Sequence, residues 1–143
     1  MPSKSKVYFF FDNKKLGLQN RGNLKRFIEY IFKKEKKQLS SLNYIFCSDK
    51  KLLEINQSFL NHDFFTDIIT FDLSEDENIC AEIYISVDRV KENSKTLKAS
   101  FTSELHRVLF HGVLHLCGYK DKTKAEKQKM REKEEYYINQ YFK

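Results

Sequence analysis

Cysteine is scarce in this chain, and its distribution excludes two common uses of the residue. The three cysteines, Cys47, Cys80 and Cys117, are odd in number and far apart, and none belongs to a C-x-x-C pair. This pattern excludes a disulfide framework and a cysteine-rich zinc site. Unpaired cysteines of this kind are typical of proteins from a reducing cytosol.

Long hydrophobic runs are also absent. The apolar run over residues 7–11 is only five residues long, whereas a membrane-spanning helix needs about 20. Neither a hydrophobic segment of signal-peptide length nor a small-residue cleavage site follows the first residues. We therefore expect a cytoplasmic protein with no membrane partner.

Proline occurs once, at Pro2, and there is neither an internal repeat nor a low-complexity linker. The length of 143 residues predicts one domain over residues 1–143. A chain of this size buries roughly two-thirds of its unfolded surface, and 41% of its residues are hydrophobic, with 13 phenylalanines among them. We expect a globular domain that folds without disulfides or metal.

Positive charge exceeds negative charge, and the two are separated along the sequence. The net charge is +6. Residues 1–40 contain eleven Lys and Arg and three Asp and Glu, and residues 120–143 contain eight basic and five acidic residues. Residues 61–90 reverse this balance, with one basic and eight acidic residues. Such segments fit a polyanion-binding surface beside an acidic patch, but lysine-rich helices are often only solvated faces. Charge alone leaves both interpretations open.

Hydrophobic periodicity predicts an α+β fold. Apolar and alternating runs indicate strands over residues 7–12, 42–47, 66–73 and 79–86, the last two joined as a hairpin by an acidic turn. Helical spacing indicates helices over residues 23–37, 50–60, 87–97, 102–117 and 122–142, with Ser48 or Asp49 as the N-cap of the second. The helix over 102–117 is apolar on more than one face, as a central, buried helix would be. We expect a single small domain with a mixed β-sheet of about four strands packed with about five helices.

The end of this central helix has the spacing of a metal site. His111 and His115 are four residues apart, so both imidazoles project from one helix face about one turn apart. Gly118 ends the helix, and the chain can then reverse and bring Asp121 to the same point. Two imidazoles and one carboxylate leave a coordination position open for water, as in catalytic zinc sites. We predict a metal-dependent hydrolase with these three ligands.

The same spacing occurs in the metzincin pattern H-E-x-x-H-x-x-G-x-x-H, with two departures. Asp121 replaces the third histidine, and Gly112 replaces the glutamate that is the general base of those peptidases. The alternative that these residues bind no metal also stays open. Two histidines at helical spacing can be ordinary core or surface residues, and Asp121 can be only a cap of the next helix. His106 falls off the ligand face, and Cys117 is expected to pack as a small apolar residue.

This segment resembles the YbeY family of bacterial endoribonucleases, the rRNA maturation factors. Residues 111–119, H-G-V-L-H-L-C-G-Y, follow the family hallmark H-G-x-L-H-L-x-G-Y-D-H position by position. Residues 55–59, 66–71 and 81–86 are similar to the family's L-N-x-x-Y/F, T-D-V-L-S-F and G-D-I-V-I-S segments. The departures that matter for the site are Lys120 and Asp121, which stand where the family has Asp and His. In addition, Phe65 replaces a proline, and Leu60 replaces an arginine associated with activity.

The resemblance implies a zinc-dependent endoribonuclease that prefers single-stranded RNA, with His111, His115 and Asp121 as ligands of one metal ion. It also implies a cytoplasmic protein that acts in ribosomal RNA processing, including maturation of the small-subunit rRNA 3′ end, and in ribosome quality control. Its partners would be ribosomal RNA and the ribosome or its small subunit, with no organic cofactor. Because Leu60 replaces the arginine, His62 or a nearby lysine would have to contact phosphate, and His62 is the candidate catalytic residue.

A carboxylate in place of a third histidine changes the electrostatics of the metal site. Zn²⁺ would keep one net positive charge instead of two, so we expect harder ions such as Mn²⁺ to be accepted as well. No glutamate beside His111 is available as a base, and the nucleophile, a metal-activated water or the RNA 2′-hydroxyl, stays open. Two other functions stay open too: a metallopeptidase, and a non-catalytic ribosome-assembly factor that binds RNA and is stabilised by metal.

Overall fold

The computed structural model of the protein describes residues 5–12 and 16–143, so three lysines of the basic amino-terminal segment, Lys4, Lys14 and Lys15, lie outside the described residues. The elements in chain order are β1 (Val7–Phe11), α1 (Arg21–Lys34), β2 (Gln38–Cys47), α2 (Asp49–Leu60), β3 (Ile68–Asp72), β4 (Asn78–Ser86), α3 (Val87–Thr96), α4 (Phe101–Leu116) and α5 (Lys124–Tyr141). This order confirms the predicted α+β class.

The clearest difference from the sequence-based expectation is in β2, which begins at Gln38 and not at residue 42. Residues 38–41 are mostly polar and show no simple alternation. They are extended because they pair with β4, where Gln38 lies opposite Asn78, across a register shift between Leu39 and Ser41. Pairing with a neighbouring strand, and not local sequence pattern, lengthens β2.

The strands form one mixed sheet in the order β1-β2-β4-β3. β1, β2 and β4 are mutually parallel, whereas β3 runs antiparallel to β4, with Ile68 opposite Ile85 and Asp72 opposite Ala81. The predicted hairpin is therefore confirmed. β3 lies at one edge of the sheet, and in the described part of the chain no strand pairs with its outer side.

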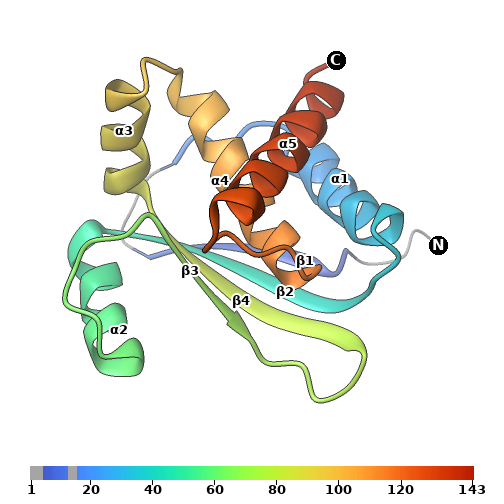
Figure 1. Ribbon diagram of the computed structural model, residues 1–143, viewed down its shortest axis with the longest axis horizontal. Helices are drawn as coiled ribbons and strands as arrows, with labels where there is room; N and C mark the ends of the chain where they lie inside the picture. The colour runs from blue at the N-terminus through green and yellow to red at the C-terminus, as the bar shows by residue number, and fades with distance from the viewer. Residues whose placement is uncertain (1–4, 13–15) are drawn as a thin grey trace.

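Helices cover the two faces of the sheet unequally. α1, α3, α4 and α5 lie on one side of the sheet and α2 lies on the other (Figure 1). The alternation along β4 explains why both faces need cover: Ile79, Ala81, Ile83 and Ile85 are buried in the larger core, and Tyr84 packs against the smaller core beneath α2. The sheet thus separates two apolar layers of different size.

α4 is the central helix of the larger core, as its all-round hydrophobicity predicts. Leu109 and Leu114 are fully buried, and the hydroxyl of Tyr44 in β2 donates a hydrogen bond of 2.9 Å to the carbonyl of Leu109. Gly112 approaches the sheet so closely that a Cβ atom there would lie 2.7 Å from Cδ1 of Ile83. This contact fixes the height of α4 above β4. Within the described ranges no helix, α4 included, is long and apolar enough to cross a membrane.

Candidate metal centre

α4 ends in a turn that brings the following chain back toward its last histidine. Gly118 has a left-handed backbone with φ of 106°, which suits a residue without a Cβ atom. Its N–H donates to the carbonyl of His115, and the N–H of Tyr119 donates to the carbonyl of Leu114, both at 3.0 Å. This pair of bonds satisfies the last carbonyls of the helix and reverses the chain. Asp121 follows three residues after the glycine.

The turn brings the three predicted ligands together. Oδ2 of Asp121 lies 3.3 Å from Nε2 of His111 and 3.4 Å from Nε2 of His115. One ligand atom from each of the three residues falls within 4.8 Å of the others, a group that could hold a metal ion. A tetrahedral zinc ion with bonds of about 2.0–2.1 Å separates its ligand atoms by about 3.3 Å. The two distances to Asp121 therefore match two edges of a zinc coordination tetrahedron.

The turn that contains Asp121 is held in place by contacts on both sides. The hydroxyl of Tyr119 donates a 2.7 Å hydrogen bond to Glu35 at the end of α1, which also accepts from Tyr137 of α5. On the other side Thr123 is the N-cap of α5 and forms a capping box. The interpretation of Asp121 as a mere helix cap is therefore wrong, and its carboxylate is left to face the histidines.

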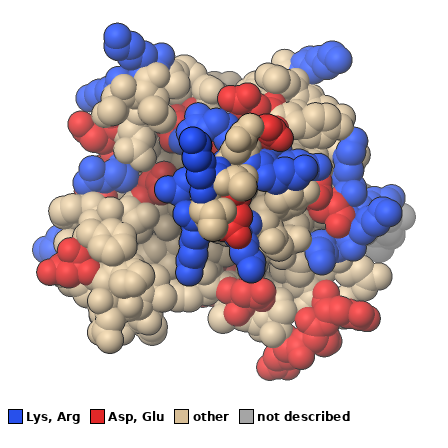
Figure 2. All heavy atoms as spheres, viewed as in Figure 1, with Lys and Arg blue, Asp and Glu red and all other residues tan. Residues whose placement is uncertain are grey.

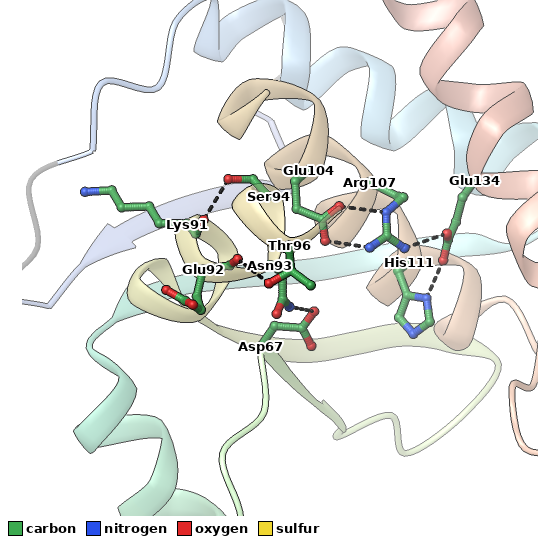
Figure 3. Close-up of polar contacts among 10 residues, drawn as sticks. All are labelled: Asp67, Lys91, Glu92, Asn93, Ser94, Thr96, Glu104, Arg107, His111 and Glu134. Carbon is green, nitrogen blue, oxygen red and sulfur yellow. Dashed lines mark hydrogen bonds and ion pairs between the residues drawn. The ribbon is translucent and has the colours of Figure 1, made fainter. Parts of the chain in front are cut away.

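A buried chain of charged side chains supports His111 from behind (Figure 3). Nδ1 of His111 lies 2.5 Å from Oε2 of Glu134 in α5, and the other Glu134 oxygen accepts from Arg107 at 3.1 Å. Arg107 also forms a two-pronged pair with Glu104, at 3.0 and 2.5 Å. Both glutamates are 2% exposed. Because an ionised carboxylate only accepts, Nδ1 carries a hydrogen and the Nε2 lone pair of neutral His111 points toward Asp121.

The charges of this network suit a cation. Two glutamates and one guanidinium leave one net negative charge behind His111, and Asp121 adds a second in front of it. Burial alone would lower the pKa of His111, but the hydrogen bond and charge of Glu134, together with Asp121 and Asp67, raise that pKa above its ordinary value. A proton or a divalent ion would compensate the same negative charge, so the two would compete for His111.

The sequence-based predictions missed the supporting residues, although both helices contain a signal. Glu104, Arg107, His111 and His115 recur at helical spacing, which puts charged and ligand side chains on one face of an otherwise apolar helix. Glu134 lies between the buried Met130 and Tyr137 of α5, where the spacing calls for an apolar residue. A charge in the middle of a buried stripe indicates a buried partner.

The ligand set opens into a groove of about 770 Å³ between the end of α4, the edge strand β3 and the segment after α2. His62 and Leu60 line this groove together with the three predicted ligands. His106 does not: it is buried, with Nδ1 2.7 Å from the carbonyl of Thr102. Cys117 is buried as well, and burial raises the pKa of its thiol to about 12.

Gly112 distinguishes this site from that of a metzincin peptidase. In those enzymes the residue after the first histidine is the general base, but here that position faces the sheet, and a Cβ atom would lie 2.7 Å from Ile83 and 3.1 Å from Ile68. A glutamate side chain there would begin against these two apolar side chains, where burying its charge is costly. The peptidase alternative therefore has no place for its base.

We expect the Gly112 contact to be measurable as a coupling between two substitutions. Gly112→Ala should destabilise the wild-type protein more than it destabilises an Ile83→Val variant, by about 1 kcal/mol, because valine lacks the Cδ1 atom that an alanine Cβ would meet. Urea unfolding of the four proteins measures this difference. Equal effects in both backgrounds would show that the close approach does not limit the residue at position 112.

Comparison with known proteins agrees with these features. The chain matches the family described as Endoribonuclease YbeY over residues 11–142. The protein of that description from Cytophaga hutchinsonii is 50% identical over 130 residues, which cover 90% of this chain and 91% of the relative. The one from Karelsulcia muelleri is 44% identical over 132 residues, which cover 92% and 93%.

A solved structure gives the same result. The solution structure of TM1509 from Thermotoga maritima superposes with a TM-score of 0.69 at 33% identity and covers 95% of this chain and 89% of that protein. These matches confirm the predicted fold, family and enzyme class. They confirm the predicted function at the level of the family. The chain belongs to the YbeY family of endoribonucleases.

Proposed function

We propose that this protein is one catalytic domain over residues 1–143 that cleaves single-stranded RNA in the groove beside α4, with His111, His115 and Asp121 holding one metal ion. The observation that supports this most is the spacing of 3.3 and 3.4 Å between the Asp121 oxygen and the two histidine nitrogens. The groove beside them supports a polymer substrate, and family membership supports RNA.

The chemistry divides between the metal and the chain. A divalent ion at this place would polarise a phosphoryl oxygen and lower the pKa of a bound water. Asp121 and the two histidines would hold the ion, and Glu134 fixes the ring of His111. His62 is our candidate for proton transfer or phosphate contact, and Lys122, in the same groove, is the nearby lysine for a phosphate.

The surface charge supports a polyanionic substrate. Figure 2 shows Lys and Arg gathered over the middle of one face, where α5 begins in Figure 1, and acidic residues at the turn between β3 and β4. Lys120, Lys122, Lys124 and Lys127 are exposed on and before the first turn of α5. Lysines beside the groove would neutralise RNA phosphates on either side of the cleaved bond.

We further propose that the RNA is ribosomal, with the 3′ end of the small-subunit rRNA as one target, that the ribosome is the partner, and that the protein works in the cytoplasm. Family membership supports this assignment. Zinc is our first choice of metal because two of the three ligands are imidazoles. The single carboxylate favours acceptance of Mn²⁺ as well.

The test is cleavage of fluorescent RNA by protein stripped of metal and then reloaded. We expect no cleavage without metal, and cleavage of single-stranded RNA, but not of the same sequence as a duplex, once Zn²⁺ or Mn²⁺ is restored. An RNA that contains the small-subunit 3′-end precursor should be cut in preference to an unrelated single strand. Binding should weaken steeply between low and moderate salt, because lysine–phosphate contacts release counterions.

Each outcome separates the proposals. RNA binding without turnover under any metal would contradict the nuclease and support the non-catalytic assembly factor. Activity restored by Zn²⁺ alone would contradict the broader metal preference. Equal cleavage of precursor and unrelated RNA would contradict the ribosomal target while leaving the nuclease intact.

A further inference from the structure

Two aromatic rings that line the groove are exposed to solvent. His62 and Phe64 lie in the segment between α2 and β3, and their rings stack with centroids 5.1 Å apart and an interplanar angle of 22°. Phe64 is 55% exposed. Both rings line the same groove as His111, His115 and Asp121. An exposed ring pair beside a candidate catalytic site calls for a ligand with a flat, apolar face.

The segment that presents these rings is fixed by a buried side chain. α2 ends in a left-handed residue, Asn61, with φ of 56°, and the N–H of His62 then donates to the backbone carbonyl of Asn56 at 3.1 Å. The side-chain amide of Asn56, whose residue is 1% exposed, donates in turn to the carbonyl of Phe64 at 2.9 Å. The backbone carbonyl and the buried side-chain amide of Asn56 thus hold His62 and Phe64, respectively, in position.

The other residues that line the groove indicate which chemical groups the ligand has in addition to a flat apolar face. Lys122, in the basic turn before α5, contributes an exposed cation to the groove, and the three candidate metal ligands line the same groove. A nucleotide of a single strand combines a phosphate with a planar base, and base–aromatic stacking is the common way in which proteins hold unpaired bases.

We propose that His62 and Phe64 form a stacking platform for one unpaired base of the RNA, close to the bond that is cut. This inference rests on the proposed ribonuclease function and names the part of the groove that binds the substrate. A base must leave its duplex before it can stack on Phe64, so the platform selects single-stranded RNA. The phenyl ring has no hydrogen-bonding group, so the platform accepts different bases.

The test is RNA binding in a chelator, where no metal-dependent cleavage occurs. Fluorescence anisotropy with a ten-nucleotide single strand would compare the full-length wild type with Phe64→Leu, which keeps apolar bulk but removes the ring face. We expect Phe64→Leu to bind roughly tenfold more weakly and Phe64→Tyr, which restores the ring, to bind as the wild type does. Phe10→Leu, at a 50% exposed ring on β1, is the matched control and should have no effect.

A set of RNAs that each lack one base locates the stacked nucleotide. At one position the missing base should weaken wild-type binding about tenfold and leave Phe64→Leu binding unchanged, since the partner ring is already gone. Unchanged affinity in Phe64→Leu, or losses that simply add, would overturn the platform. If binding follows the prediction but added metal produces no cleavage, the nuclease proposal fails while the platform stands.

Discussion

His115→Ala should remove metal-dependent RNA cleavage almost completely, by about a thousandfold or more. A metal ion contributes several kcal/mol to phosphodiester hydrolysis, and each 1.4 kcal/mol is a tenfold change in rate. His115 is one-third exposed, at 32% of its side chain, so the fold should survive the change. The measurement is single-turnover cleavage of a fluorescent single strand with saturating Zn²⁺.

Thermal unfolding separates a lost metal site from a lost fold. Zinc should raise the melting temperature of the wild type, because an ion that binds only the folded state stabilises it by mass action, and it should leave His115→Ala unchanged. His106→Gln alters a histidine on the same helix that stacks on Tyr141 instead of facing the groove, and it should keep the zinc response. Full activity in His115→Ala would contradict the ligand assignment.

Glu134→Ala should lower both the stability of the fold and the affinity of the metal site. The change removes one of the two carboxylates that accept from Arg107 and the acceptor of His111, while the Arg107–Glu104 pair remains. Loss of a hydrogen bond to a charged group of this kind costs about 1.5–3 kcal/mol. Loss of the group that orients a ligand histidine should also weaken zinc binding about 10- to 100-fold. Urea unfolding and competition with a chromophoric chelator measure the two effects.

The role of Glu134 in orienting His111 has a direct spectroscopic sign. Long-range ¹H–¹⁵N NMR of the metal-free protein at high pH should show the His111 hydrogen on Nδ1 in the wild type and a mixture of tautomers in Glu134→Ala. Glu135→Ala, at the exposed neighbouring position, should change neither the tautomer nor the zinc affinity. Wild-type zinc affinity in Glu134→Ala would show that this carboxylate supports only the fold.

Local features of the sequence predicted the elements and the ligand face. The helical spacing of His111 and His115, and a glycine placed to end the helix, involve neighbours within ten residues, so periodicity and capping rules suffice. Between two adjacent N-cap candidates the pattern was ambiguous. The structure selects Ser48, whose side chain accepts from the N–H of Lys51 at 3.1 Å, while Asp49 pairs with Arg89 at 2.7 Å.

Contacts between distant segments could not be predicted in the same way. Tyr119 meets Glu35 across 84 residues, and His111 meets Glu134 across 23, and nothing local to either partner names the other. The first four residues of β2 are extended only because β4 lies beside them. Asp121 was predictable as a candidate metal ligand because the turn that contains it is short. That Asp121 does not cap the next helix could not be predicted, because Thr123 is the N-cap of that helix.

The most direct test of the three-ligand site is native mass spectrometry of zinc-loaded protein, with the wild type beside His111→Ala and Asp121→Ala. We expect one zinc ion per wild-type chain and none in either variant, with both variants still folded. Zinc retained by Asp121→Ala would reduce the site to two histidines and contradict the role of the turn. No zinc on the wild type would contradict the metal centre itself.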